Sequence, residues 1–167
     1  HHFSLTHEAV KGYNTNTKVS PPLRTQEDVN SLIDGLKDGT IDCIATDHAP
    51  HAREEKEVEY DYAPFGISGL ETAVPLAWQN LYLSGHLNLL ELINALSTAP
   101  AKILGIDRGT LKVGKVADIT VIDPELTQTV DTKKFVSLGK NSPFNGWKLT
   151  GWPVMTIKEG KILYSGI

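Results

Sequence analysis

A helix-like pattern that runs directly into a short strand-like pattern restricts this 167-residue chain to folds that pack helices on a sheet. Apolar residues between positions 29 and 36 recur at the i, i+3, i+4, i+7 spacing of an amphipathic helix. Thr25 is a suitable N-cap for this helix, and Gly39 ends it. The apolar run 41–45 follows at once and is too short for a buried helix, so we predict a buried parallel strand there.

Three more helices are predicted before residue 106. Ser68 and Glu71 form a capping-box pattern that opens a helix extending to residue 81. Asn88 and Glu91 repeat the pattern at the start of a second helix that reaches residue 96. A third helix is expected over residues 97–105, with a proline near its first turn.

The pattern changes to short β-rich runs from Gly109 onward. A strand is predicted over 117–122, ending at Asp123-Pro124. Runs 154–158 and 161–164 flank Glu159-Gly160 and predict a hairpin. Alternating strands and helices followed by short strands indicate the α/β class, with one layer over residues 1–105 and a small β appendage over 106–167.

Composition excludes several classes of protein. The net charge of -4 argues against a nucleic-acid partner, which usually meets a basic stripe. No apolar run reaches the roughly 18 residues of a membrane span, and the first residues lack the features of a signal peptide. Cys43 is the single cysteine, so an intrachain disulfide is impossible. We interpret it as a small buried thiol, with a catalytic thiol as the alternative, in a reducing cytoplasmic setting.

The segment 44–51 carries the strongest chemical signal. An apolar strand would deliver Asp47 and His48 at its C-terminal end, where parallel α/β folds build their sites. Asp and His both bind metals, and a carboxylate also moves protons. Pro50 stiffens the turn before His51. On spacing alone, a turn-capping Asp47 with solvated or backbone-bonded histidines explains the segment equally well.

Other candidate positions admit two interpretations each. Adjacent His1 and His2 would point to opposite faces of a strand and could not easily share one metal. Phe65-Gly66 is either a point where backbone approaches a ligand closely or a turn before a helix. The charged stretch 53–61 is expected to be an irregular, mobile loop, either a solvated face or a lid over the site.

At these residues the chain resembles the dihydroorotases of the monofunctional bacterial type, within the amidohydrolase superfamily. The resemblance covers nearly the whole chain, and runs 46–51 and 141–144 are its more specific parts. The matching stretches are residues 1–2, 18–24, 38–42, 45–51, 63–66, 69–72, 96–104, 109–111, 117–121 and 139–144.

The resemblance implies the C-terminal part of a metal-dependent (β/α)8 TIM barrel, plus part of a small β-sandwich domain. It implies that Asp47 is both a metal ligand and the catalytic acid/base, and that His51 holds the substrate carboxylate. Phe65 and Gly66 match a segment whose backbone touches the pyrimidine ring. Ser20 stands where many members have a substrate-binding Asn. The hydroxyl of Ser20 could still form a hydrogen bond with the substrate.

The resemblance also implies zinc, with two ions in a complete active site. The other metal ligands and an arginine for the substrate carboxylate are expected upstream of His1, so His1 and His2 are not counted as ligands. We therefore interpret the chain as a fragment of a dihydroorotase that interconverts N-carbamoyl-L-aspartate and L-dihydroorotate in pyrimidine (UMP) biosynthesis. Its expected partners are the small-molecule substrate, the N-terminal half of the same enzyme, and either a second copy or aspartate transcarbamoylase.

Two alternatives stay open at this point. A hydantoinase or allantoinase would use the same fold on another cyclic amide, although His51 favours an anionic substrate. A non-catalytic homologue would act as a scaffold for aspartate transcarbamoylase, although it would have no chemical need for Asp47.

Overall fold

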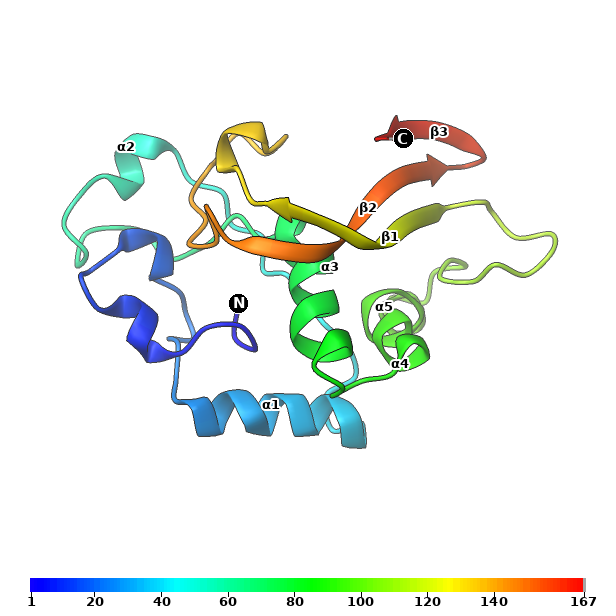
Figure 1. Cartoon of the computed structure of the whole chain (residues 1–167), viewed down its shortest axis with the longest axis horizontal. Coiled ribbons are helices and arrows are strands. Elements are labelled where there is room, and N and C mark those ends of the chain that lie inside the picture. Colours follow the sequence, from blue (N-terminus) through cyan, green and yellow to red (C-terminus); the bar gives the residue numbers. More distant parts are fainter. Residues whose placement is uncertain (167) are drawn as a thin grey trace. The chain divides into compact units, whose positions relative to one another are not determined.

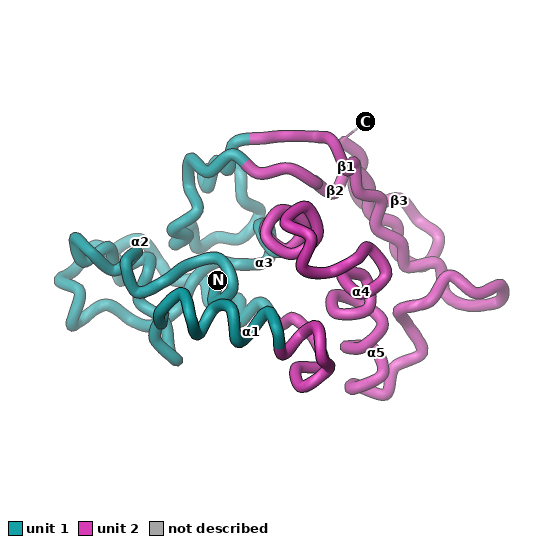
Figure 2. Tube along the Cα trace, turned by 60° about the horizontal axis from the view of Figure 1, so that its bottom comes forward, with its two compact units in different colours: residues 1–34, 46–73, 129–148 teal, residues 35–45, 74–128, 149–167 magenta. Residues whose placement is uncertain are grey.

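A computed structural model describes residues 1–166, which form two compact units (Figure 2). Unit 1 comprises residues 1–34, 46–73 and 129–148, and unit 2 comprises residues 35–45, 74–128 and 149–167. Each unit thus gathers three separate stretches of the chain. The expected domain boundary near residue 106 stays a prediction about the complete protein.

The first long helix forms as the sequence predicts. Helix α1 spans Gln26–Asp38 (Figure 1). Val29 and Ile33 are buried on its apolar face. At its start the Asp28 carboxylate accepts from the Thr25 hydroxyl and the Thr25 N–H, and the Thr25 hydroxyl accepts from the Asp28 N–H, one of the first N–H groups that need acceptors. Gly39 follows with φ +83°, a conformation that ends a helix. In unit 1 this helix is preceded by 3-10 turns at His7–Val10 and Thr15–Thr17.

The predicted strand over 41–45 is wrong, because in the described residues this run pairs with no other strand. The Ile41 N–H donates to the Gly35 carbonyl at 2.8 Å, and the Ile44 N–H donates to the Ala95 carbonyl at 3.0 Å. Carbonyls of helical segments therefore accept from these two N–H groups, where the carbonyls of a neighbouring strand would accept in a sheet. Cys43 within this run is half-buried rather than fully buried, so the interpretation as a core thiol holds only in part.

The predicted capping box at Ser68 and Glu71 is wrong. Helix α3 spans Leu70–Ala77 and continues as a π-helical turn over Trp78–Leu83, so the helix begins one residue later than a Ser68 N-cap would place it. The Ser68 hydroxyl donates to the Gly139 carbonyl at 2.8 Å instead. The Glu71 carboxylate accepts from the backbone N–H groups of Val136 and Ser137 at 2.8 and 3.1 Å. Both side chains bind a distant segment of unit 1 rather than their own helix.

The second capping box is confirmed. Helix α4 spans Leu89–Ile93; the side-chain Oδ1 of Asn88 accepts from the N–H groups of Leu90 and Glu91, and the Glu91 carboxylate accepts from the Asn88 N–H at 2.7 Å. The two helices predicted over 88–96 and 97–105 are instead one continuous helical stretch: α4, a π-helical turn at Asn94–Thr98 and α5 at Ala99–Ile103. The wider turn before Pro100 accommodates a ring that a regular helix would reject.

Three strands form one sheet in the order β1-β2-β3 (Figure 1). Strand β1 spans Ile119–Thr129, β2 spans Lys148–Lys158 and β3 spans Lys161–Ser165. The predicted hairpin is confirmed, with Lys158 opposite Lys161 and both turn residues, Glu159 and Gly160, at positive φ (+51° and +77°). Strand β1 continues through Asp123-Pro124, where we expected it to end, because an edge strand tolerates a missing N–H.

The charged stretch 53–61 is not irregular throughout. Helix α2 forms one turn at Arg53–Lys56, and the Glu55 carboxylate accepts from the Ala52 N–H at its start. Lys56 is buried, which an open charged loop would not predict.

Within residues 1–166, no helix combines the length and the apolar character needed to cross a membrane.

Candidate active-site segment

Asp47 is an exposed residue with a left-handed backbone, at φ +46°. Asp adopts this conformation more readily than most residues, but it remains uncommon and clusters at functional sites. The next residue, His48, forms an isolated parallel bridge with Ile67, and the Ala49 N–H donates to the Ile67 carbonyl at 3.0 Å. This bridge joins the Asp47 segment to the segment that carries Phe65 and Gly66.

His48 has a structural role that its sequence context did not reveal. Its ring Nδ1 accepts from the backbone N–H groups of Gly69 at 3.1 Å and Leu70 at 3.3 Å. The imidazole thus caps the start of α3, in the place predicted for Ser68. A neutral ring that accepts at Nδ1 carries its proton at Nε2, so this nitrogen is a donor rather than a metal ligand.

The rings of His1 and His2 contact each other, with centroids 4.3 Å apart and planes 51° apart. The expectation that they point to opposite faces of a strand is wrong, because these residues lie at a turn. Burial lowers the pKa of His2 below its usual value, and the negative charge of Asp47 acts in the opposite direction. Asp47 therefore lies within electrostatic range of His2.

His51 is held at three points. Its backbone N–H donates to Asn141 Oδ1 at 2.9 Å, and its ring Nε2 donates to the Phe65 carbonyl at 2.9 Å. Its ring Nδ1 lies 3.6 Å from Glu55 Oε2 at the start of α2. These contacts orient the imidazole, which is 23% exposed, toward the Phe65-Gly66 segment.

Gly66 has to be glycine. Its φ is +138°, and a Cβ at this position would lie 2.5 Å from the Ala49 Cβ and 3.0 Å from His51 Nε2. The Ala49 and His51 segment lies against this backbone, and the approach of a ligand to Phe65-Gly66 stays a prediction. Phe65 is 56% exposed, so its ring stays available to a ligand.

Asn141 organises this site, and sequence reasoning did not include it among the site residues. Its Oδ1 accepts from the His51 N–H at 2.9 Å and lies 2.9 Å from the Ser68 hydroxyl, whose single proton it shares with the Gly139 carbonyl. Its Nδ2 donates to the carbonyls of Ala49 and Gly66, both at 3.0 Å. The only sequence signal for this role was its place in the run 141–144. One side chain thus joins the segment after Asp47 to the segment after Phe65.

Ser20 is exposed and forms a cis peptide bond with Pro21. Its side chain takes no part in the hydrogen bonds that join His51, Phe65 and Gly66. The structure therefore brings together three of the predicted substrate-binding residues and links Asp47 to them through the 48–67 bridge. The role of Ser20 stays a prediction.

The donor groups of this chain do not by themselves make a metal centre. Across residues 1–166, no three His, Cys, Asp or Glu side chains come together in a way that could hold a metal ion. Asp47 offers one exposed carboxylate as a donor, and His48 is committed to capping α3. A metal bound at Asp47 would need ligands from other residues.

A separate cavity of about 460 Å³ lies within unit 2 and has a mainly apolar lining. None of the predicted site residues lines it. Its lining residues are Val74, Trp78, Tyr82, Leu89, Leu92, Ile93, Leu96, Thr120, Ile122 and Pro124.

The chain belongs to the amidohydrolase family, whose sequence model matches residues 2–163. Within that family its curated relatives include dihydroorotases, at 55% identity for the protein of Pelotomaculum thermopropionicum and 56% for that of Geobacter metallireducens. Each alignment covers 98% of this chain but only 38% of the relative. The chain therefore spans about two fifths of the length of these relatives, and family membership implies a metal cofactor in general terms.

Solved structures share the same mixed helix and strand fold. The L-hydantoinase (dihydropyrimidinase) from Arthrobacter aurescens superposes with a TM-score of 0.92 at 34% identity, covering 99% of this chain and 38% of the hydantoinase. The D-hydantoinase from Thermus sp. gives a TM-score of 0.88 at 29% identity, over 98% of this chain and 38% of that protein. The expected fold class is thus confirmed at the level of an amidohydrolase with mixed helices and strands.

Proposed function

We propose that this chain is the C-terminal part of a dihydroorotase, which interconverts N-carbamoyl-L-aspartate and L-dihydroorotate in pyrimidine biosynthesis. The observation that carries the proposal is the 55–56% identity to dihydroorotases along 98% of the chain. The arrangement of Asp47, His51 and Gly66 supports it, because the segments that hold them are joined within one unit. The proposed fold is part of a (β/α)8 barrel followed by part of a β-sandwich.

Asp47 acts as the acid/base in this proposal. It accepts the proton of the attacking water and passes it to the ring amide nitrogen as the C–N bond breaks, a role suited to an exposed carboxylate. His51 binds the substrate carboxylate; its two ring nitrogens face the Phe65 carbonyl and Glu55 in the absence of substrate, so the substrate carboxylate replaces one of these contacts. The Phe65-Gly66 backbone lies against the ring, and Ser20 offers a hydroxyl. Positioning by such groups removes part of the entropic barrier.

Zinc is the proposed cofactor, with two ions in the complete active site. When bound, zinc lowers the pKa of a coordinated water toward about 7. From this chain, Asp47 would contribute one carboxylate ligand. The remaining ligands would come from the N-terminal part of the enzyme, which we propose as the first partner of this chain. A second copy or aspartate transcarbamoylase is the further proposed partner, in the cytoplasm.

A hydantoinase is the second candidate, since the L-hydantoinase structure superposes with a TM-score of 0.92. Its sequence identity of 34% is well below that of the dihydroorotases. Hydrolysis of dihydroorotate, hydantoin and allantoin by the complete enzyme, compared at equal concentration, separates these candidates and allantoinase. A scaffold without catalysis would hydrolyse none of the three.

The test of Asp47 is an Asp47→Asn variant of the complete, zinc-supplemented enzyme. General acid-base catalysis contributes about 10²- to 10⁴-fold, so we expect kcat for dihydroorotate to fall by at least about 100-fold. Asp42→Asn is the matched control: this exposed aspartate lies five residues earlier, outside the site, and should leave kcat unchanged. Near-normal kcat in Asp47→Asn would remove Asp47 from the mechanism.

A further inference from the structure

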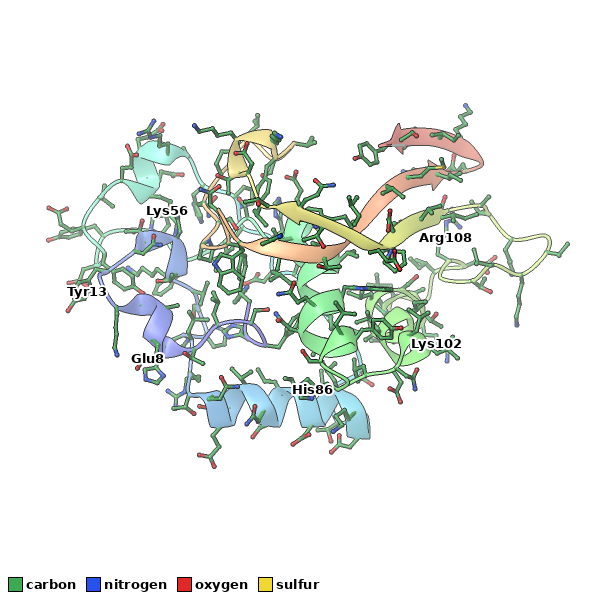
Figure 3. All side chains as sticks on the ribbon, viewed as in Figure 1. Glu8, Tyr13, Lys56, His86, Lys102 and Arg108 are labelled. Carbon is green, nitrogen blue, oxygen red and sulfur yellow. The ribbon has the colours of Figure 1, made fainter. Side chains whose placement is uncertain are left out.

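Two lysines are buried in unit 1 beside the Phe65-Gly66 segment. Lys18 is 9% exposed, with Tyr60 and Phe65 beside its ammonium, and Lys56, at the end of α2, is 5% exposed and lies against Pro64 (Figure 3 labels Lys56). Lysine is seldom buried unless a carboxylate pairs with it. Within residues 1–166, neither ammonium forms an ion pair with a carboxylate.

Backbone carbonyls take the place of the missing carboxylates. The Lys18 ammonium donates to the carbonyls of Tyr60 at 2.8 Å and Asp61 at 2.9 Å. The Lys56 ammonium donates to the Pro64 carbonyl at 2.7 Å. Hydrogen bonds from a charged donor are shorter and stronger than neutral ones. A single ammonium also has three donors, which lets Lys18 bridge two successive carbonyls.

The Phe65-Gly66 segment itself is bound on both sides. The Lys18 ammonium lies 4.8 Å from the centroid of the Phe65 ring, within range of a cation–π interaction. The Lys18 carbonyl accepts from the Gly66 N–H at 2.9 Å, and the Phe65 carbonyl accepts from the His51 ring. The backbone from Tyr60 to Gly66 is therefore held by Lys18, Lys56 and His51, together with the Asn141 amide at Gly66 and the Glu59 carbonyl at Tyr62 and Ala63.

Burying the two ammonium groups costs free energy that buried apolar side chains would avoid. Burial, and then the nearby charge of Lys18, lower the pKa of Lys56 to about 8. Two like charges oppose each other here, while apolar side chains of similar length would fill the same space. The charges instead bind carbonyls, all within a few residues of the proposed substrate-binding backbone.

We infer that Lys18 and Lys56 are positioning residues, which hold the Phe65-Gly66 backbone in its binding conformation before substrate arrives. The inference rests on the proposed function, in which this backbone lies against the substrate ring. Substrate then binds without ordering the segment first, so the lysines act on binding rather than on the chemical step. They contact the segment and not the reacting atoms.

The test uses Lys18→Met and Lys56→Met in the complete enzyme, with Lys11→Met as the matched control. Lys11 is exposed and pairs only with Glu8 on the surface, so its loss should change nothing. For each buried lysine we expect KM for dihydroorotate to rise about tenfold, with kcat within about threefold of wild type. Amide hydrogen exchange of residues 60–66 should be about tenfold faster in the substrate-free variants.

Lys18→Gln and Lys56→Gln cover the case in which a methionine variant does not fold, because an amide keeps one or two donors. They should show the same changes at smaller size. Unchanged KM and unchanged exchange, or a fall in kcat at constant KM, would overturn the inference. If wild type does not hydrolyse dihydroorotate, the proposed function fails, while the exchange measurement still decides whether the lysines order the segment.

Discussion

Asn141 uses all four hydrogen-bonding positions of its amide group, and it does so with only 5% of the residue exposed. Two of its partners, Ala49 and His51, follow the candidate catalytic aspartate, and two, Gly66 and Ser68, follow the exposed Phe65. Each of these partners would otherwise be a polar group in need of a partner. The geometry of the site therefore depends on one neutral side chain that takes no part in the proposed chemistry.

Replacing Asn141 with alanine should destabilise the protein by about 2–4 kcal/mol, because several buried polar groups lose their partner at once. Urea unfolding of the Asn141→Ala variant measures the loss. The matched control is Asn145→Ala, which removes only exposed hydrogen bonds to Thr132 and should cost about 1 kcal/mol or less. Equal effects of the two substitutions would mean that Asn141 is not the organising residue.

Gly66→Ala should also destabilise, by about 2–4 kcal/mol, since the new Cβ would overlap Ala49 at a backbone φ that alanine avoids. The double variant Gly66→Ala with Ala49→Gly removes the overlap with the Ala49 Cβ but keeps the backbone strain and the 3.0 Å approach to His51 Nε2. We therefore expect it to recover only part of the stability lost by the single variant, as seen by thermal unfolding. Full recovery would show that φ at this position is unimportant.

The helices show two different uses of polar residues at their starts. Asn88 and Glu91 form the capping box of α4 as their spacing predicts. Ser68 and Glu71 have the same spacing but bind residues of the 136–141 region, and His48 caps α3 instead. A local pattern is thus followed only where no distant segment competes for the same side chains. The π-helical turn before Pro100 likewise joins two helices that the sequence presents as separate.

At the scale of the element, Asn88→Ala should cost about 1 kcal/mol, the usual value for a lost N-cap. Asn30→Ala is the matched control, because Asn30 lies inside α1, where alanine is the better helix former. It should leave stability unchanged or raise it by a few tenths of a kcal/mol. Equilibrium urea unfolding compares the two, and a neutral Asn88→Ala would show that packing alone holds α4 in place.

For the whole molecule, the buried Lys56 predicts a dependence of stability on pH. Its pKa is about 8 in the folded protein, against an ordinary value of 10.5. Below pH 8 both states bind this proton and stability carries the full penalty of burying the charge. Between pH 8 and about 10.5 the folded state has lost the proton while the unfolded state keeps it, so stability rises with pH.

The expected rise is at most about 3 kcal/mol between pH 7 and pH 10. It is measured as the difference in unfolding free energy between wild type and Lys56→Met, which cancels the titration of all other groups. The Lys56→Met variant should lack this rise. The unfolding free energy of wild type minus that of Lys56→Met should therefore increase steadily between pH 8 and pH 10. A difference that does not change with pH would show that Lys56 keeps its ordinary pKa.

The chain by itself determined the elements whose signals are local. Helix α1 with its Thr25 cap, the α4 capping box and the hairpin at Glu159-Gly160 depend on contacts within a few residues, and the structure has all three. The family could also be recognised from the 46–51 and 141–144 runs, and the match over residues 2–163 confirms it. The roles of Asp47, His51 and Ser20 remain predictions.

Only the tertiary structure decided the features that depend on segments far apart in sequence. The run 41–45 has the composition of a strand, but its backbone N–H groups bond to helical segments. Nothing local to Asn141 shows that it bonds to residues some 75–90 positions earlier. From the sequence, Lys18 and Lys56 would be expected on the surface. In the fold they are buried, and backbone carbonyls of the 60–64 segment accept hydrogen bonds from them. In each case the partner that satisfies a buried polar group is supplied by the fold, and no spacing along the chain encodes it.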